Sequence, residues 1–395
     1  MTKRGTSKKS SKSQTSSIGR LLYTLLLAVL AIALYGLEQS DVIDLGLNED
    51  AGENTSPGSD VAPPVSGDFY SIYFTKAINS NDEAVHHGAE IEQALIAALD
   101  GATTSIDAAL FELNAPDTTA AMVRALGRGV NMRIVFDNEH ALDDPESTAQ
   151  EVIDAGAEFR SDERSALMHN KYFIIDKRYI WTGATNITRN GIYNNNNNAI
   201  LIESPQLVAN FQADFDEMFV DGIFTRSADS GVIPGRNFTQ NGTEFETYFA
   251  PEDGALIEQR IAELASQAQQ SIRVMAFSFT LESIGNVMIE RHNAGVTVEG
   301  VFETTGSLQG QMTPLLCAGA NMRQDGNPSI MHHKVFIFDE QIVALGSFNF
   351  SASARDNNSE NLIIIHNPDI AAAYTAEWQA RFNEGHAPEA SDVSC

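Results

Sequence analysis

The sequence predicts an α/β protein that contains two copies of one domain. A pattern of the form His-x-Lys-x4-Asp-x6-Gly-x2-Asn occurs twice, beginning at His169 and at His332. The segments around the two patterns also repeat in the same order, 163 to 166 residues apart. That period is too long for a solenoid repeat and indicates duplication of a whole domain. Within each copy, strand-like apolar runs alternate with helical stretches, which is typical of a layered α/β fold.

The N-terminal part of the chain predicts export. Residues 1–20 carry six basic residues and no acidic one, and residues 21–37 form an uncharged apolar run of 17 residues. This run has the minimum length for a transmembrane helix. Because the basic residues precede it, we expect a cytoplasmic tail, one anchor in the cell membrane, and the remainder outside the cytoplasm. The alternative is a cleaved signal peptide ending near Ala31-Ile32-Ala33, after which the protein is secreted.

Residues 38–66 are acidic and rich in Gly, Pro and Ser, and we interpret them as a flexible stalk. The two cysteines predict no disulfide framework and no zinc cluster. Cys317 lies in an apolar segment, and we expect it to be a small buried residue. Trp181 and Trp378 are expected in the core. The motif segments contain no clustered carboxylates and no His-x-x-x-His pair, so the sequence implies neither a metal nor a cofactor.

The first copy, residues 67–227, shows the order of strands and helices. Ile91, Leu95 and Leu99 recur at helical spacing and predict a helix. The other expected elements are strands at 105–111, 130–136 and 171–175, and helices around 122–126 and 148–155. The first of these helices ends at Arg128-Gly129, since glycine readily adopts the left-handed conformation of a C-cap.

The second copy, residues 244–395, repeats this order. Three pairs of segments match between the copies: 105–111 with 271–277, 128–130 with 294–296, and 155–160 with 318–323. The stretch between the copies, residues 228–243, is rich in Gly and Asn, and we expect it to be a linker.

Side chains alternate between the two faces of a strand, and this divides the motif residues. His169 and Lys171 share one face, and so do His332 and Lys334, whereas His333 points away from them. We therefore expect His332, and not His333, in the functional site.

The aspartates of the pattern fall on the other face. Asp176 and Asp339 belong to the candidate set through the motif, but they lie opposite the histidines. We expect them to fix the turn that leads into the Gly-x-x-Asn segment.

The doubled pattern resembles that of the phospholipase D superfamily, whose members carry two His-Lys-Asp motifs around one phosphodiester-cleaving centre. The resemblance covers both halves, from about Gly67 to the C-terminal region. It implies two phospholipase D-like α/β/α sandwich domains packed with pseudo-two-fold symmetry. It also implies a metal-independent reaction through a covalent phosphohistidine. His169 is then the nucleophile, because the first motif supplies it in many tandem members, and His332 is the general acid and base.

Such a reaction needs a nucleophile, a proton donor, and donor groups around the non-bridging phosphate oxygens. Each copy supplies half of these groups, so we expect one site between the copies and a monomeric chain. The candidate catalytic residues are His169, Lys171, Asp176, Asn186, His332, Lys334, Asp339, Asn349 and Glu360. The candidate substrate-binding residues are Lys171, Asn186, Lys334, Ser347 and Asn349.

The two halves differ where the resemblance implies an acid that orients a catalytic imidazole, often across the interface. Glu360 follows the second motif, whereas the matching position after the first motif is Asn197. If Glu360 reaches across the interface, it serves His169 and leaves His332 with Asn197. If it serves its own half, the roles of the two histidines are exchanged. The first copy also has alanine where the second keeps Ser347.

The pattern predicts the reaction and leaves three hypotheses about the substrate. The first is hydrolysis or transfer of phosphatidyl groups at the outer membrane face, within which lies cardiolipin-synthase-like transfer. The second is a membrane-anchored nuclease. The formal charge of -28, with only four lysines beyond residue 20, disfavours nucleic acid as a partner. The third is a non-catalytic surface module, which two intact motifs disfavour. We favour the phospholipid as substrate.

Overall fold

The computed structural model describes residues 65–80, 82–225, 233 and 235–395, all within one compact unit. The expected basic tail and anchor, and nearly all of the expected stalk, lie outside these residues. Among the helices that are described, none has both the length and the apolar character needed to cross a membrane.

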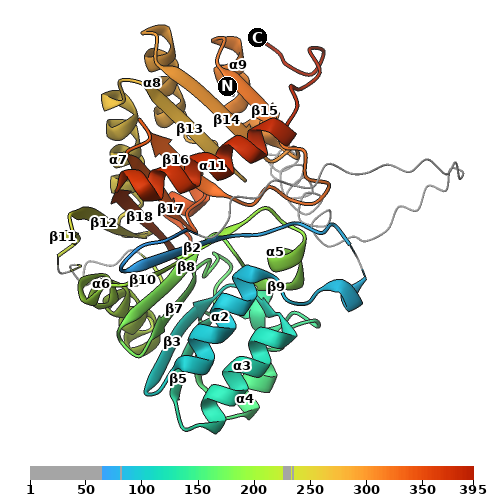
Figure 1. Cartoon of the computed structure of the whole chain (residues 1–395), viewed down its shortest axis with the longest axis vertical. Coiled ribbons are helices and arrows are strands. Elements are labelled where there is room, and N and C mark those ends of the chain that lie inside the picture. Colours follow the sequence, from blue (N-terminus) through green and yellow to red (C-terminus); the bar gives the residue numbers. More distant parts are fainter. Residues whose placement is uncertain (1–64, 81, 226–232, 234) are drawn as a thin grey trace, which may run out of the picture. The chain divides into compact units, whose positions relative to one another are not determined.

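Two sheets of eight strands have the same strand order, as duplication predicts (Figure 1). The first runs β1 (Val65–Ser66), β2 (Tyr70–Phe74), β10 (Asn198–Glu203), β8 (Tyr179–Gly183), β7 (Lys171–Ile175), β3 (Ser105–Leu110), β5 (Asn131–Phe136) and β6 (Glu158–Ser161). The second runs β11 (Asn237–Gln240), β12 (Thr243–Ala250), β18 (Glu360–His366), β17 (Ile342–Gly346), β16 (Lys334–Phe338), β13 (Ser271–Ala276), β14 (Thr297–Phe302) and β15 (Asn321–Gln324). Because β11 lies inside 228–243, the second sheet begins within the stretch expected to be a linker.

The helices also occur in matching sets. The first copy has α2 (Glu90–Gly101), α3 (Pro116–Gly127), α4 (Ala149–Asp154), α5 (Arg189–Tyr193) and α6 (Pro205–Asp216). The second has α7 (Gly254–Gln267), α8 (Glu282–Asn293), α9 (Met312–Cys317), α10 (Ala352–Asp356) and α11 (Pro368–Glu384). Short turns of helix are η1 (Glu83–Val85), η2 (Asn138–Leu142), η3 (Glu217–Asp221) and η4 (Ser307–Gln309), and β4 (Leu113–Asn114) pairs with β9 (Ile187–Thr188). Local sequence sets several boundaries: Ser204 caps α6 just before a proline, and Gly129 follows α3 with a φ of 88°.

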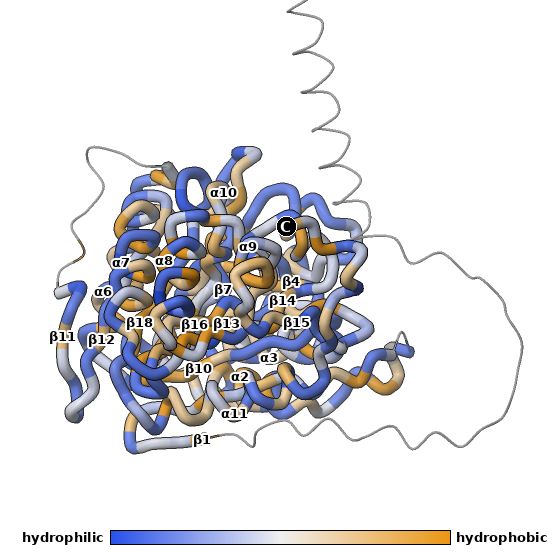
Figure 2. Tube along the Cα trace, turned by 90° about the horizontal axis from the view of Figure 1, so that it is seen from above, coloured by the Kyte–Doolittle hydropathy of each residue, from blue (hydrophilic) through white to orange (hydrophobic). Residues whose placement is uncertain are grey.

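Three apolar clusters form the layers. One lies under α2–α4 on the outer face of the first sheet, and another lies under α7–α9 on the outer face of the second. The third is shared by the inner faces of both sheets and by α6 and α11. Figure 2 shows apolar stretches gathered around central strands such as β10 and β16. Tyr172 belongs to the shared cluster and Phe173 to an outer one, which confirms the predicted alternation along β7.

Matching contacts join the two copies. Met168 forms a parallel bridge with Ser359, and Asn196 forms one with Met331. The two bridges are equivalent under the 163-residue repeat, so the copies pack with pseudo-two-fold symmetry, as the resemblance implied.

The cysteine prediction was wrong. Cys317, at the end of α9, is exposed and forms a disulfide with Cys395, with a Cα–Cα distance of 5.5 Å. The chain turns back after α11, and His386 pairs with Gln324 at the edge of the second sheet, which brings the C-terminus to α9. Nothing in the local sequence around either cysteine indicates this return. Trp181 and Trp378 are buried as expected.

Candidate active site

The two motif histidines stand just before matching strands, β7 and β16, where the copies meet. The amide of His169 donates to the carbonyl of Ser359 at 2.9 Å, and the amide of His332 donates to the carbonyl of Asn196 at 2.9 Å. Each histidine is thus held by backbone of the opposite copy. Both side chains are buried, with 5% and 6% of their residue surface exposed. One centre between the copies therefore contains both imidazoles.

The motif lysines lie beside the histidines and are fully buried. Lys171 donates from Nζ to the carbonyl of His169 at 2.6 Å, and Lys334 donates to that of His332 at 2.9 Å. Each ammonium also lies over a phenylalanine ring, at 4.7 Å from the centroid of Phe111 in the first copy. Burial of two ammonium groups in one centre is costly, and an anionic ligand there offsets part of that cost.

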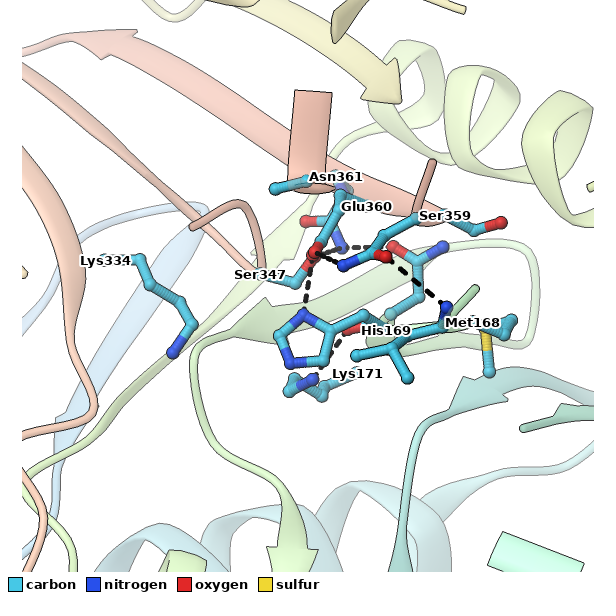
Figure 3. A network of polar contacts seen from close by, with 12 residues as sticks. Met168, His169, Lys171, Lys334, Ser347, Ser359, Glu360 and Asn361 are labelled. Carbon is cyan, nitrogen blue, oxygen red and sulfur yellow. Dashed lines mark hydrogen bonds and ion pairs between the residues drawn. The ribbon is translucent and has the colours of Figure 1, made fainter. Parts of the chain in front are cut away.

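Glu360 orients His169 across the interface, as Figure 3 shows. Its Oε2 lies 2.8 Å from His169 Nδ1 and accepts a hydrogen bond from Ser347 Oγ at 2.7 Å. Asn358 donates to Oε1 at 3.2 Å. Because the carboxylate accepts at Nδ1, the Nδ1 proton of His169 faces Glu360, and Nε2 keeps its lone pair. Burial raises the pKa of Glu360 to about 7, against the opposing charge of Lys171.

Asn197 holds His332 in the matching way but without a charge. Its Nδ2 donates to the carbonyl of Gly191 at 2.8 Å, which leaves Oδ1 as the acceptor for His332 Nδ1 at 2.9 Å. The Nε2 atom of His332 is therefore also directed away from its orienting partner. Burial and the charges of Lys334 and Lys171 lower the pKa of this histidine well below its ordinary value.

The same causes act on His169. Burial lowers its pKa well below the ordinary value, and Lys171 and then Lys334 lower it further. The lysines of both copies thus lower the pKa of each imidazole, as expected if the four side chains lie in one centre.

The motif glycines allow this construction. Gly183 and Gly346 have φ values of 152° and 153°, and a Cβ at either would approach a carbonyl of the neighbouring strand to 2.3 Å and 2.2 Å. Those carbonyls belong to Asn198 and Asn361, each directly after an orienting residue. A side chain at these glycines would push away the strand that carries Asn197 or Glu360.

The motif aspartates bind a different turn from the one expected. Asp176 accepts backbone hydrogen bonds from Thr103, Thr104 and Ser105, at 2.9, 2.7 and 3.1 Å, and so fixes the turn before β3. Asp339 binds the turn before β13 in the same way. The predicted role at the turn into Gly-x-x-Asn was wrong, because β7 runs antiparallel to β3 and its end lies beside the start of β3. Neither aspartate contacts a motif histidine.

The motif asparagines lie close to the site but differ in their surroundings. Asn186 donates from Nδ2 to the carboxylate of Glu112, and its Oδ1 is buried with no hydrogen-bond partner among the described residues. The Oδ1 of Asn349 is buried in the same condition. Both amides are only partly buried as residues, which suits groups that meet a ligand.

The comparisons with known proteins agree with this geometry. A family model described as "Cardiolipin synthase, PLD-like domain" matches residues 95–219 and 261–382, more than half of the chain. The chain belongs to the phospholipase D superfamily. The mitochondrial cardiolipin hydrolase of Chlamydomonas reinhardtii is 33% identical over 121 residues, which are 31% of this chain and 54% of that protein. The phospholipase D of Rickettsia bellii is 30% identical over 141 residues, 35% of this chain and 69% of that protein.

This chain therefore spans about half the length of the first of these curated relatives, and the match covers only a third of this phospholipase D-like chain. The phosphatidylserine synthase of Haemophilus influenzae has a solved structure that aligns with a TM-score of 0.60, at 12% identity, over 80% of this chain and 87% of that one. That likeness supports the same two-domain fold.

Sequence reasoning about this phospholipase D-like site was incomplete in two places. His333 points away from the centre as predicted, but it is buried and lies 2.8 Å from Asn198 Nδ2 and 3.2 Å from Glu377 Oε1. Glu112 was missed. Comparison of the repeats could have found it, because Ser278 occupies the matching position after Phe277. Within the described residues, no group of three or more His, Cys, Asp or Glu side chains is arranged to hold a metal ion.

Proposed function

We propose that this chain is a phosphodiesterase of the phospholipase D type that cleaves or transfers phosphatidyl groups through a phosphohistidine. One observation carries the proposal: two buried histidines from matching motifs lie in one centre, each with Nδ1 held by a partner from the other copy. Both Nε2 atoms are thereby directed away from their orienting groups, and two buried lysines stand beside them.

The reaction proceeds in two steps. Nε2 of His169 attacks phosphorus and forms a P–N bond while the P–O bond to the leaving alcohol breaks, and protonated His332 donates its Nε2 proton to that alcohol. In the second step His332 takes a proton from water or an acceptor alcohol, whose oxygen attacks phosphorus as the P–N bond breaks. Lys171 and Lys334 stabilise the charge on the non-bridging oxygens in both steps.

The split of roles follows from the two orienting residues. The carboxylate of Glu360 stabilises positive charge on His169, which develops as its Nε2 forms the P–N bond. The neutral amide of Asn197 gives His332 no such help, and a less stabilised imidazolium donates its proton more readily. His169 is therefore assigned as the nucleophile and His332 as the acid and base.

A phospholipid is the favoured substrate. Relatives that match this chain include proteins named cardiolipin hydrolase and phospholipase D, and the chain carries a formal charge of -28, which opposes a polyanionic nucleic acid. The disulfide between Cys317 and Cys395 supports a location outside the cytoplasm, since such bonds persist in oxidising compartments. Together with the apolar run at residues 21–37, it supports a cell-membrane protein whose catalytic domains lie outside.

The test uses the full chain in detergent. Phosphatidylcholine, phosphatidylglycerol, cardiolipin, single-stranded DNA and RNA are offered separately with a chelator present, and we expect turnover of lipids only. Preferential cleavage of DNA or RNA would make the chain a nuclease. With an activated diester, His332→Asn should accumulate phosphate on a peptide that contains His169. If the wild-type protein instead carries the phosphate on the peptide that contains His332, the two histidines have the opposite roles.

A tag at Met1 and protease added outside intact cells test the location. We expect the tag to be protected while the catalytic domains are digested. Protection of the C-terminus would reverse the orientation.

A further inference from the structure

The two halves of the site match so closely that each departure from symmetry is informative. Phe111 and Phe277 are equivalent, because each lies under the lysine of its own copy, at 4.7 and 4.9 Å from ring centroid to Nζ. The next residue is Glu112 in the first copy and Ser278 in the second. The first half thus has a carboxylate at the edge of the centre where the second half has a neutral hydroxyl.

Glu112 is bound to the motif asparagine of its own half. Its Oε2 accepts a hydrogen bond from Nδ2 of Asn186. A primary amide nitrogen has two N–H groups, about 120° apart, and each donates over about 2.9 Å. If the second N–H of Asn186 binds a phosphate oxygen, that oxygen lies about 5 Å from the Glu112 oxygen.

His140 lies on the same side of the site as Glu112. Its ring stacks on Phe111 with a centroid distance of 4.4 Å, and its Nδ1 lies 2.8 Å from Asp137 Oδ1. Burial lowers the pKa of His140, but the hydrogen bond to Asp137 and the charges of Asp137 and Glu112 outweigh it and raise the pKa. Glu112 therefore lies near enough to act on the ring that stacks on Phe111. The second half has glycine at the position that matches His140.

A carboxylate at this place acts differently on the two charge states of a phosphate. Two buried lysines attract a dianion more strongly than a monoanion, so without Glu112 the centre would favour phosphomonoesters, including the phosphatidate product. At about 5 Å, a carboxylate repels the second negative charge of a monoester by an amount that corresponds to about tenfold to hundredfold in affinity. A diester has only one negative charge and escapes this extra repulsion.

We propose that Glu112 is a specificity-determining residue that selects monoanionic phosphodiesters against dianionic phosphomonoesters. This inference rests on the proposed function, because it assumes that the phosphate binds between the motif lysines and asparagines. It assigns no chemical step to Glu112. Its effect is to keep a site with two ammonium groups from being blocked by its own product.

The experiment measures binding of two inhibitors that differ in charge. Methyl phosphate, a dianion at pH 8, and dimethyl phosphate, a monoanion, are titrated into the full-length protein in detergent by calorimetry. In Glu112→Gln, which keeps an acceptor for Asn186, affinity for methyl phosphate should rise about tenfold or more beyond any rise for dimethyl phosphate, because Glu112 repels two charges in the monoester and one in the diester. Glu112→Ser, which copies the second half, should give the same ratio. The matched control Ser278→Ala changes no charge and should leave the ratio unaltered.

Each outcome has a distinct meaning. If both Glu112 variants bind both inhibitors as the wild type does, or change both affinities by the same factor, Glu112 does not discriminate between the two charge states and the inference is wrong. Turnover of bis(p-nitrophenyl) phosphate is measured in parallel on the wild type. A protein that binds both inhibitors but never cleaves this diester would contradict the proposed function and leave the charge selection to be judged by the binding ratio alone.

Discussion

Replacement of Glu360 by glutamine tests the proposed assignment of His169 as the nucleophile. The Oε2 atom of Glu360 lies 2.8 Å from His169 Nδ1, and the residue is fully buried. A unit charge on the imidazole, about 4 Å from the carboxylate, interacts by about 4 kcal/mol at an effective dielectric constant near 20. The imidazole carries only part of that charge in the transition state, and glutamine can still accept from His169. We therefore expect a loss of about 2 to 3 kcal/mol, which lowers kcat roughly thirtyfold to two-hundredfold.

The matched change in the other half should cost much less. Asn197→Ala removes a neutral hydrogen bond of 2.9 Å to His332, worth about 1 kcal/mol or roughly fivefold in rate. Ser347→Ala, which gives the second half the alanine of the first, keeps the charge of Glu360 and should cost less than tenfold. Initial rates with bis(p-nitrophenyl) phosphate give kcat, and thermal melting followed by circular dichroism shows whether each variant is folded. The reasoning is refuted if folded Asn197→Ala loses as much activity as folded Glu360→Gln.

Three further expectations concern the same centre. His169→Asn and His332→Asn should each lower kcat by at least about a thousandfold. The side chain of His333 contacts Asn198 and Glu377, so His333→Asn should act mainly on the melting temperature and much less on kcat. An equal loss of kcat in all three variants would contradict the predicted faces of these histidines. The proposed mechanism requires neutral His169 and protonated His332. Because both pKa values lie well below the ordinary value of about 6.5, kcat/KM should already be falling at pH 6.5 and should continue to fall as pH rises. A profile still rising at pH 8 would contradict this mechanism. Activity should survive dialysis against EDTA, and loss that is restored by a divalent ion would rule out the mechanism.

Much of the fold could be predicted from the sequence because the duplicated domain shows the same order of strands, helices and motif residues twice. The period-two alternation around His332 predicts that His333 points away from the centre, which is confirmed, and the repeat offset alone matches Glu360 with Asn197. Whether Glu360 contacts His169 or His332 depends on how the two copies pack, and no local sequence pattern describes that packing.

Other features depended on contacts that are distant in sequence. Cys317 and Cys395 are 78 residues apart and meet because the tail after α11 returns to the sheet edge. Asp176 binds a turn more than 70 residues earlier, because antiparallel pairing brings the end of one strand to the start of another. Glu112 was visible in the sequence, but its significance depends on its hydrogen bond to Asn186.

The bridges between Met168 and Ser359 and between Asn196 and Met331 would serve equally well in a pair of separate, identical chains. Such a pair would have to carry the same residue at both orienting positions, so an acid gained beside one imidazole would appear beside the other. Joining the copies in one polypeptide removes that obligation. A mutation can then improve one half as an attacking group and the other as a proton donor, and selection can act on each separately. The pairing of Glu360 with His169 and of Asn197 with His332 is an asymmetry that one fused chain can carry and two identical chains cannot.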